Sequence, residues 1–342
     1  MAFKINGVTV LDDNREVTVD GITATANDRV FVGVTATNSP TSVLSPSIFQ
    51  GSVSGYTSGG GNSGDTIDKF PFSSDSNATD VGNLSVSKNI TSGFGSAYHG
   101  FHVGGYNNDG AVEKYPFSTD TNASISGSLV RKRYGTSGQA SETHGYTSGG
   151  YTSPGSPPLS YSDIIEKYPF AFDGFMSTVG DLVTTKYISG GQSSTTHGYA
   201  TGGSSPNPTA ANSIDKFPFS ADANATDVGD LSNITATTGG QSSTTHGYAI
   251  GYSGAPDVSY IDKYPFSSDT NASDIGDLSQ KRSTSAGQSS TVSGYASGGG
   301  PAPAQSNVID KFPFSSDTNA TDVGDLTVAR QYVAGTQART IQ

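Results

Sequence analysis

The stretch Ile214-Asp215-Lys216-Phe217-Pro218-Phe219 decides the fold, because it occurs six times with only Ile/Val, Asp/Glu and Phe/Tyr exchanged. We predict that it forms the third strand of a repeated unit. The copies are 45–53 residues apart and are anchored by Lys69, Lys114, Lys167, Lys216, Lys263 and Lys311. A period of about 40–50 residues is typical of a β-propeller, in which each repeat forms one blade.

The fourth copy shows the rest of the unit. Residues 191–196 and 198–203 predict two short strands with a turn at His197-Gly198, and residues 225–231 predict a fourth strand. No run of apolar residues has helical spacing. One copy has too little apolar surface to be stable alone, and a closed ring leaves no unpaired edge. We therefore predict an all-β, six-bladed β-propeller of four-stranded antiparallel blades.

A Gly-Gly pair closes the predicted second strand in five copies. The pairs are Gly59-Gly60, Gly104-Gly105, Gly149-Gly150, Gly202-Gly203 and Gly298-Gly299. With this pair before a variable loop and an aromatic strand, the chain resembles the kelch-type β-propellers. It differs from that family in having no Trp and in carrying Gly251-Tyr252 in the fifth copy. We expect the Phe/Tyr-Pro-Phe end of each third strand to supply the aromatic packing between blades.

Three segments follow from this organisation. Residues 1–40 are predicted to be an N-terminal β docking segment, residues 41–54 a linker, and residues 55–342 the propeller. Residues 330–340 align with residues 186–196, the run that leads through the first strand of a blade. We therefore expect this C-terminal strand to complete the first blade and close the ring. Residues 50–54 are the alternative candidate for that position.

Composition excludes several classes of function. The 342-residue chain has a net charge of −12, whereas phosphate binding needs a basic face, so we expect no nucleic-acid partner. The absence of Cys excludes disulfides, thiolate metal sites and a Cys nucleophile. No segment approaches the ~20 apolar residues of a membrane span, so no membrane insertion is expected. The N-terminus lacks the pattern of a secretion signal.

Residues 1–40 are predicted to contain three short strands, one within residues 1–11, where Asn6-Gly7 is a hairpin-type turn pair, and two near residues 17–19 and 30–32. The opening from Lys4 to Arg15 resembles the starts of structural proteins of marine tailed bacteriophages, including tail-fibre-like ones. That resemblance implies docking to other virion proteins through the N-terminal segment. The docking residues are then Lys4, Ile5, Asn6, Val8 and Val10. The alternative is an ordinary small β-segment that covers one edge of the propeller.

Repeated polar residues offer candidates for chemistry. His99, His144, His197 and His246 occupy equivalent places, and we interpret them as hydrogen-bonding a turn rather than binding a metal. Asp75, Asn77, Asp317 and Asn319 are weak calcium candidates, because their turns alternate oxygen-bearing side chains as calcium loops do. These turns lack the central Gly and the downstream Glu of a calcium loop, so we favour a role in capping the turn. Each anchor Lys is expected to meet a carboxylate of an adjacent strand, such as Asp227 or Asp230 in the fourth copy.

Loops between the second and third strands vary from copy to copy and should emerge on one face of the ring. Drift in unconstrained loops is the alternative explanation for this variation. Tyr and Asn suit adaptable recognition. The candidate binding residues are Tyr106, Asn108, Tyr151, Tyr161, Tyr252 and Tyr260.

We therefore expect a non-enzymatic phage virion protein, a tail, fibre or decoration component without a cofactor. It would be made in the host cytoplasm and located in the virion. Its propeller would mediate protein or host-surface glycan binding, and homo-oligomers are possible. The alternatives are a bacterial surface adhesin or scaffold propeller and, third, a kelch-type oxidase-like enzyme.

Overall fold

The computed structural model of the chain describes residues 3–5, 8–11, 49–61, 64–106, 110–152, 160–204, 212–233, 238–254, 257–300 and 305–340. Side chains are described from residue 49 onward within these ranges, apart from residues 238 and 252–258. The chain divides into two compact units, residues 1–44 and 45–342. In the first unit, β1 (Phe3–Ile5) pairs antiparallel with β2 (Val8–Leu11), with Ile5 opposite Val8. This is the hairpin predicted at Asn6-Gly7, whereas the strands predicted near 17–19 and 30–32 lie outside the described residues.

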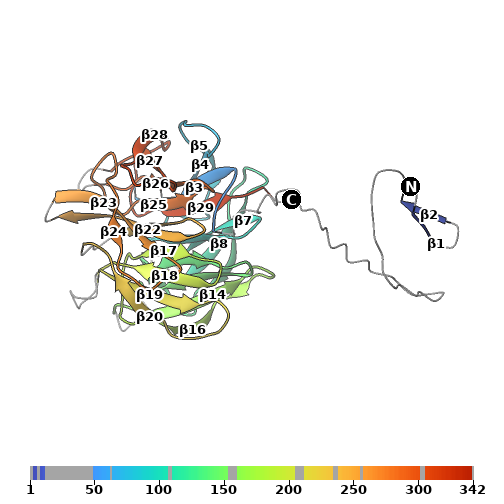
Figure 1. The fold of residues 1–342 in the computed structure, drawn as a ribbon, viewed down its shortest axis with the longest axis horizontal. Helices are drawn as coiled ribbons and strands as arrows, with labels where there is room; N and C mark the ends of the chain where they lie inside the picture. Colours follow the sequence, from blue (N-terminus) through green and yellow to red (C-terminus); the bar gives the residue numbers. More distant parts are fainter. Residues whose placement is uncertain are drawn as a thin grey trace. The chain divides into compact units, whose positions relative to one another are not determined.

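The second unit is a six-bladed β-propeller of four-stranded antiparallel blades, as predicted (Figure 1). Strands are given from the axis outward. Blade 1 contains β29 (Ala334–Ala338), β3 (Ser54–Ser58), β4 (Thr66–Pro71) and β5 (Thr79–Asn83). Blade 2 contains β6 (Ser92–Gly95), β7 (His99–Val103), β8 (Ala111–Pro116) and β9 (Ser124–Ser128). Blade 3 contains β11 (Ser137–Ala140), β12 (His144–Ser148), β14 (Ile164–Pro169) and β16 (Ser177–Asp181).

The other three blades repeat this order. Blade 4 contains β17 (Gly190–Ser193), β18 (His197–Thr201), β19 (Ser213–Pro218) and β20 (Thr226–Asp230). Blade 5 contains β21 (Thr238–Ser242), β22 (His246–Gly254), β23 (Asp257–Pro265) and β24 (Ser273–Asp274). Blade 6 contains β25 (Ala286–Ser289), β26 (Ser293–Ser297), β27 (Val308–Pro313) and β28 (Thr321–Asp325). The anchor phrase is thus the third strand of every blade, and His197 begins β18 rather than lying in the preceding turn.

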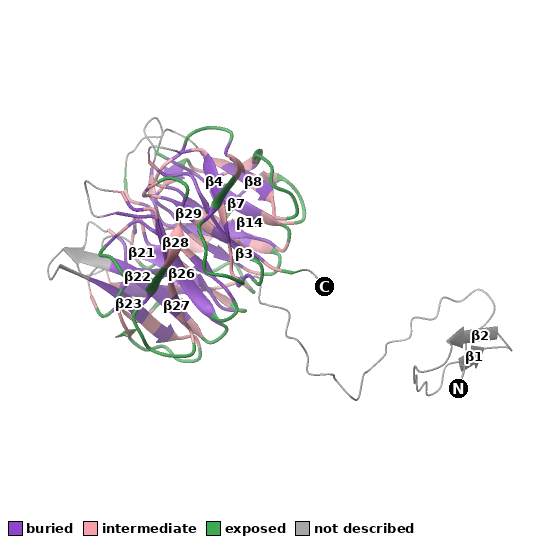
Figure 2. Cartoon of the chain, turned by 90° about the horizontal axis from the view of Figure 1, so that it is seen from above, coloured by how far each residue is buried: buried purple, intermediate pink, exposed green. Residues whose placement is uncertain are grey.

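The apolar core is divided among the six blade interfaces rather than gathered in one centre. Each buried cluster joins two neighbouring blades, for example Tyr146 and Ile165 of blade 3 with Phe217 of blade 4. The Tyr146 ring stacks on Phe219 at 4.8 Å and tilts against Phe217 at 5.6 Å. The same contact between a second strand and the Phe/Tyr-Pro-Phe of the next blade recurs at all six interfaces. The predicted source of inter-blade aromatic packing is therefore confirmed. In Figure 2 the strands of the propeller are largely purple, which marks buried residues, while the green, exposed residues lie mainly in the turns around them.

Glycine packs the innermost layer around the axis. A Cβ on Gly191 of β17 would overlap with the carbonyl oxygen of Gly138 in blade 3, and Gly138, Gly240, Gly287 and Gly335 meet the same obstacle in their preceding blades. Beside this layer, Gln192 Nε2 donates to the Tyr248 carbonyl of blade 5 at 2.9 Å. Only a residue without a side chain lets six strands approach so closely, which explains part of the 44 Gly in the sequence.

A repeated Lys–Asp ion pair, which we call the outer latch, joins each blade to the next on the outside of the ring. Lys216 Nζ lies 2.8 Å from Asp269 Oδ1, in the turn before the last strand of blade 5. The other five latches are Lys69–Asp120, Lys114–Asp173, Lys167–Asp222, Lys263–Asp317 and Lys311–Asp75. The prediction that Lys216 pairs with Asp227 or Asp230 is wrong, because Lys216 reaches forward to the next blade. Asp227 instead accepts a hydrogen bond from Gly229 N at 3.2 Å.

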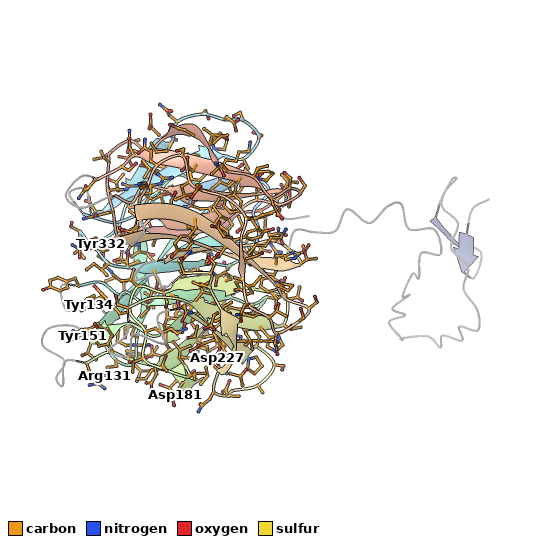
Figure 3. The ribbon with its side chains drawn as sticks, turned by 60° about the vertical axis from the view of Figure 1, so that its left-hand side comes forward. Arg131, Tyr134, Tyr151, Asp181, Asp227 and Tyr332 are labelled. Carbon is orange, nitrogen blue, oxygen red and sulfur yellow. The ribbon has the colours of Figure 1, made fainter. Side chains whose placement is uncertain are left out.

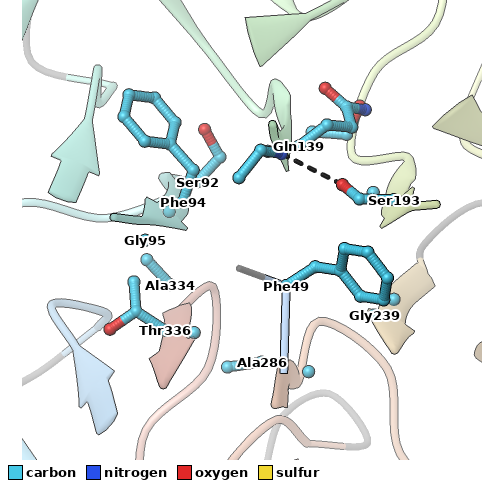
Figure 4. Close-up of a pocket in the computed structure, with 18 of the residues that line it drawn as sticks. Phe49, Ser92, Phe94, Gly95, Gln139, Ser193, Gly239, Ala286, Ala334 and Thr336 are labelled. Atoms are coloured by element: carbon cyan, nitrogen blue, oxygen red, sulfur yellow. Dashed lines mark hydrogen bonds between the residues drawn. The ribbon is translucent and has the colours of Figure 1, made fainter. Parts of the chain in front are cut away.

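The ring closes through the C-terminal strand. β29 pairs antiparallel with β3, with Thr336 opposite Tyr56. The alternative strand, near residues 50–54, takes another role: Gly51 makes an isolated parallel bridge to Ser290. Phe49 is 5% exposed and lies in the central channel among the innermost strands (Figure 4). Its carbonyl accepts a hydrogen bond from Gln337 Nε2 at 2.9 Å.

Two blades depart from the repeat. In blade 5 the β22–β23 ladder continues to Gly254 opposite Asp257, so a strand extension replaces the expected loop over 252–260. In blade 3 the turn carries β15 (Gly174–Phe175), which pairs in parallel with β9 of blade 2. No helix in the described part of the chain is long and apolar enough to cross a membrane.

Candidate binding face

The loops and inter-blade links lie on one side of the ring, which we call the link face, and five tyrosines gather there. This tyrosine cluster consists of Tyr106, Tyr134, Tyr151, Tyr161 and Tyr187. Tyr134 is its hub, with ring centroids 5.1 Å from Tyr106, 5.7 Å from Tyr151 and 5.5 Å from Tyr187. Most of these pairs meet edge to face, the arrangement that aromatic rings prefer. Figure 3 shows Tyr134 and Tyr151 on the same side of the propeller as Tyr332.

Backbone pairing fixes the cluster on the scaffold. β10 (Arg133–Tyr134) is a link segment that pairs with β13 (Tyr151–Thr152), so Tyr134 lies opposite Tyr151. Isolated bridges join Tyr151 to Tyr161 and Tyr187 to Ser204. The residues before Tyr134 and Tyr187 are buried cations, Arg133 and Lys186, whose side chains are anchored in blades 3 and 4. The rings are therefore held by rigid elements.

The surroundings of Tyr134 and Tyr187 favour the neutral phenol. Burial raises the pKa of Tyr187, and the neighbouring Tyr134, Tyr332 and Tyr161 raise it further. Burial also raises the pKa of Tyr134, with Tyr106 and Tyr151 contributing. The hydroxyl groups of Tyr134 and Tyr187 thus stay protonated at neutral pH and can both donate and accept hydrogen bonds. An apolar ring edge beside a neutral hydroxyl suits binding of amphipathic surfaces such as sugar rings or protein side chains.

A strained ring of backbone surrounds the mouth of the channel on the link face. Ile90, Ile188, Thr284 and Tyr332 have φ of 55–61°, a region that β-branched and bulky side chains rarely adopt. Gly135 stands at the equivalent place between blades 2 and 3, with φ of 64°. The link backbones bond to one another around the axis, as when Ile188 N donates to Gly135 O at 2.7 Å. Strain of this kind gathers at functional sites, which marks the same face as the tyrosine cluster.

The sequence-predicted binding residues divide into three groups. Tyr106, Tyr151 and Tyr161 come together in the cluster, and Tyr106 is 43% exposed. Asn108 and the side chain of Tyr252 lie outside the described residues. Tyr260 is corrected: it is fully buried, because residue 260 lies within strand β23 rather than in a loop.

Sequence reasoning missed Tyr134, Tyr187 and Tyr332. All three follow closely on a cation at the same place in the repeat, Arg133, Lys186 and Arg330. A comparison of the links between blades, rather than of the loops alone, would have found them.

The other candidate groups serve the scaffold. His144, His197 and His246 each bond through Nδ1 to the hydroxyl of the preceding Thr at 2.8 Å, the local role expected of them. Burial lowers the pKa of each of these imidazoles, and the nearby anchor Lys lowers it further. Among the described residues, no group of three or more His, Asp or Glu is placed to hold a metal ion.

The calcium candidates are likewise occupied by protein contacts. Asp75 and Asp317 accept from Lys311 and Lys263 in the outer latch. Asn77 Oδ1 and Asn319 Oδ1 accept from the backbone N–H of Asp325 and Asp277, both at 3.1 Å. These turns therefore cap the neighbouring blade, and a bound ion would have to compete with a Lys ammonium at each.

The axial channel is lined by small and neutral side chains, chiefly Gly, Ser, Ala, Thr and Gln, with Phe49 in its centre. No titratable side chain is among its described lining residues. No known protein-family model and no curated protein matches this sequence. The propeller is therefore established by the structure, while the kelch-type and bacteriophage resemblances remain hypotheses.

Proposed function

We propose that this protein is a non-enzymatic binding protein whose tyrosine cluster contacts a glycan or another protein. The observation that carries the proposal is the convergence of five tyrosines from three consecutive blades on one face. Tyr buries a large rigid surface with little loss of conformational entropy, and is enriched in recognition surfaces for that reason. The neutral channel lining supports binding rather than catalysis as the role of the fold.

The two faces of the ring carry different elements, which supports a role in which the propeller projects from a larger particle. Gly51 and Thr340 lie at the face that carries the three-residue turns between the first and second strands, opposite the link face. Gly51 N bonds to Ser289 O, just before the turn over residues 290–292, and Thr340 N bonds to Ser52 Oγ. Within the propeller, Gly51 and Thr340 thus lie on the side away from the tyrosine cluster. In the setting we propose, a phage virion, residues 1–40 dock to the particle and the propeller faces the host. The kelch-like label belongs to the same proposal.

Binding is tested with the full-length protein on a glycan array and against host cells. Replacing both Tyr134 and Tyr187 with Ala removes the hub of the cluster, and we expect binding to fall at least ~10-fold, since interface aromatics often contribute 1–2 kcal/mol or more. The matched control is Tyr98→Ala, a 59% exposed tyrosine in a turn on the opposite face. Equal binding by both variants with an unchanged melting temperature would place the binding site elsewhere.

The setting needs its own measurement. Antibody against the propeller, with gold detection in electron microscopy, should label tail or fibre tips of purified particles. Label on the capsid favours a decoration role. Label on cell envelopes and none on particles replaces the virion proposal with the adhesin.

A further inference from the structure

Five blades bury an ion pair beside the second and third strands. The pairs are Arg330–Asp68, Lys88–Glu113, Arg133–Glu166, Lys186–Asp215 and Arg282–Asp310. In every pair the cation precedes the innermost strand of its blade, four residues after a buried Leu of the inter-blade link. Both side chains are at most 1% exposed. A buried charge requires such a partner, because desolvation is costly.

Blade 5 carries the carboxylate without the cation. Asp262 is the equivalent of Asp215, since each lies opposite an Ala of the second strand, Ala249 or Ala200. Asp262 is also fully buried. In the sequence, Thr235 stands at the position equivalent to Lys186. Thr235 lies four residues after Leu231, and Lys186 lies four residues after the equivalent Leu182. Within the described residues, no side-chain cation pairs with Asp262.

The hydrogen bonds that Asp262 does make do not occupy the place of the cation. Ser232 donates to it from N at 2.9 Å and from Oγ at 2.6 Å. In blade 1 Asp68 receives the same two bonds, from Thr327 N at 3.0 Å and Thr327 Oγ1 at 2.7 Å, and still binds Arg330. The cation therefore approaches the carboxylate from a separate direction.

Blade 4 shows what lies in that direction. Lys186 Nζ is 3.0 Å from Asp215 Oδ1, 3.1 Å from Ala200 O and 2.9 Å from Ser213 O. Arg282 in blade 6 uses the same two carbonyls, Ala296 O and Val308 O. The equivalents in blade 5 are Ala249 O and Tyr260 O. Ser213 O takes a ladder bond from Gly202 N as well, so a paired carbonyl still accepts the cation.

We propose that blade 5 binds a monovalent cation of the size of potassium or ammonium at Asp262, Ala249 O and Tyr260 O. The site needs one positive charge, and carbonyl oxygens with one carboxylate are ligands that replace the hydration shell of potassium. A divalent ion of the magnesium kind would demand octahedral geometry and retain several waters, which a place shaped for an ammonium does not offer. The free ion thus substitutes for the missing side chain.

The test compares thermal unfolding of the full-length protein at pH 8 in potassium chloride and in tetramethylammonium chloride of equal ionic strength. Tetramethylammonium screens the −12 net charge as potassium does, but it is too large for the site. A difference in melting temperature between the two salts therefore reports potassium bound at the site. We expect potassium to raise the melting temperature by about 2–4 °C for each factor of ten above its Kd. Asp262→Asn and Thr235→Lys should each abolish this difference. The first removes the negative charge that binds the ion, and the second supplies a Lys ammonium in place of the ion.

A second readout is independent of stability. Crystals soaked in rubidium chloride should show anomalous scattering between Asp262, Ala249 O and Tyr260 O in the natural protein and none in Thr235→Lys. Equal melting in the two salts together with no rubidium at Asp262 would overturn the proposal and leave a protonated carboxyl in its place.

Discussion

Asp262 shows how much one missing charge matters. Burial raises the pKa of its carboxyl to about 6, from an ordinary value of 3.8, while hydrogen bonds from Ser232 oppose the shift. Between pH 4 and 6 the folded state therefore binds more protons than the unfolded state, so this group makes stability fall as the pH rises through that window. Above pH 6 the cost is complete, at most about 3 kcal/mol by the conversion of 1.36 kcal/mol per pKa unit.

We predict that Asp262→Asn stabilises the protein at pH 8 in tetramethylammonium chloride by about 1–2 kcal/mol, less than the full cost because one Ser232 bond is weakened. The gain should disappear below pH 4, where Asp262 is protonated in both states, and should shrink in potassium chloride. Chemical denaturation at several pH values measures it.

The matched control is Asp310→Asn, at the equivalent place in blade 6. It leaves Arg282 fully buried without its carboxylate and should cost about 3–5 kcal/mol at pH 8. The two Asp→Asn changes are chemically identical. Opposite effects on the free energy of unfolding are therefore expected only if the presence or absence of the cation in the inter-blade link decides the outcome. Destabilisation of similar size in both variants would contradict this account.

At the scale of the strand, the innermost layer depends on glycine. We predict that Gly191→Ala destabilises the propeller by about 1–3 kcal/mol, because its Cβ overlaps with the Gly138 carbonyl and backbone must shift to admit it. Gly174→Ala is the control, since a Cβ there meets only Phe172, at 4.0 Å. Urea unfolding compares the two, and equal effects would show that the axial strands are not close-packed.

The elements also show which features the sequence makes predictable. Six copies of one phrase were enough for the fold, the strand order and the aromatic interfaces, because the repeat period and the strand pattern are local properties. The partner of Lys216 was wrong, because the choice between Asp227 in its own blade and Asp269 in the next depends on how blades stack. Tyr260 was misplaced because strand pairing continued through a segment that resembled a loop. Tyr134 and Tyr187 were missed because links draw together only in the closed ring.

For the whole molecule, closure joins residues far apart in the chain. β29 completes blade 1, Arg330 neutralises Asp68 at 3.0 Å, and Thr336 Oγ1 bonds to the Tyr115 hydroxyl at 2.7 Å. All of these contacts come from residues 328–342, which lie more than 200 positions from their partners. The C-terminal segment therefore stabilises two blades and the axial layer together.

We predict that deletion of residues 328–342 lowers the melting temperature by roughly 10 °C or more, because it exposes the β3 edge and leaves Asp68 buried without its cation. Deletion of residues 1–44 is the control, since they form a separate compact unit and should leave the propeller transition within about 2 °C of the full-length value. Scanning calorimetry measures both, with size-exclusion chromatography to detect association through the open edge. An unchanged transition after the C-terminal deletion would mean that the ring is held by its other five interfaces alone, and closure by β29 would then be a geometric feature without an energetic role.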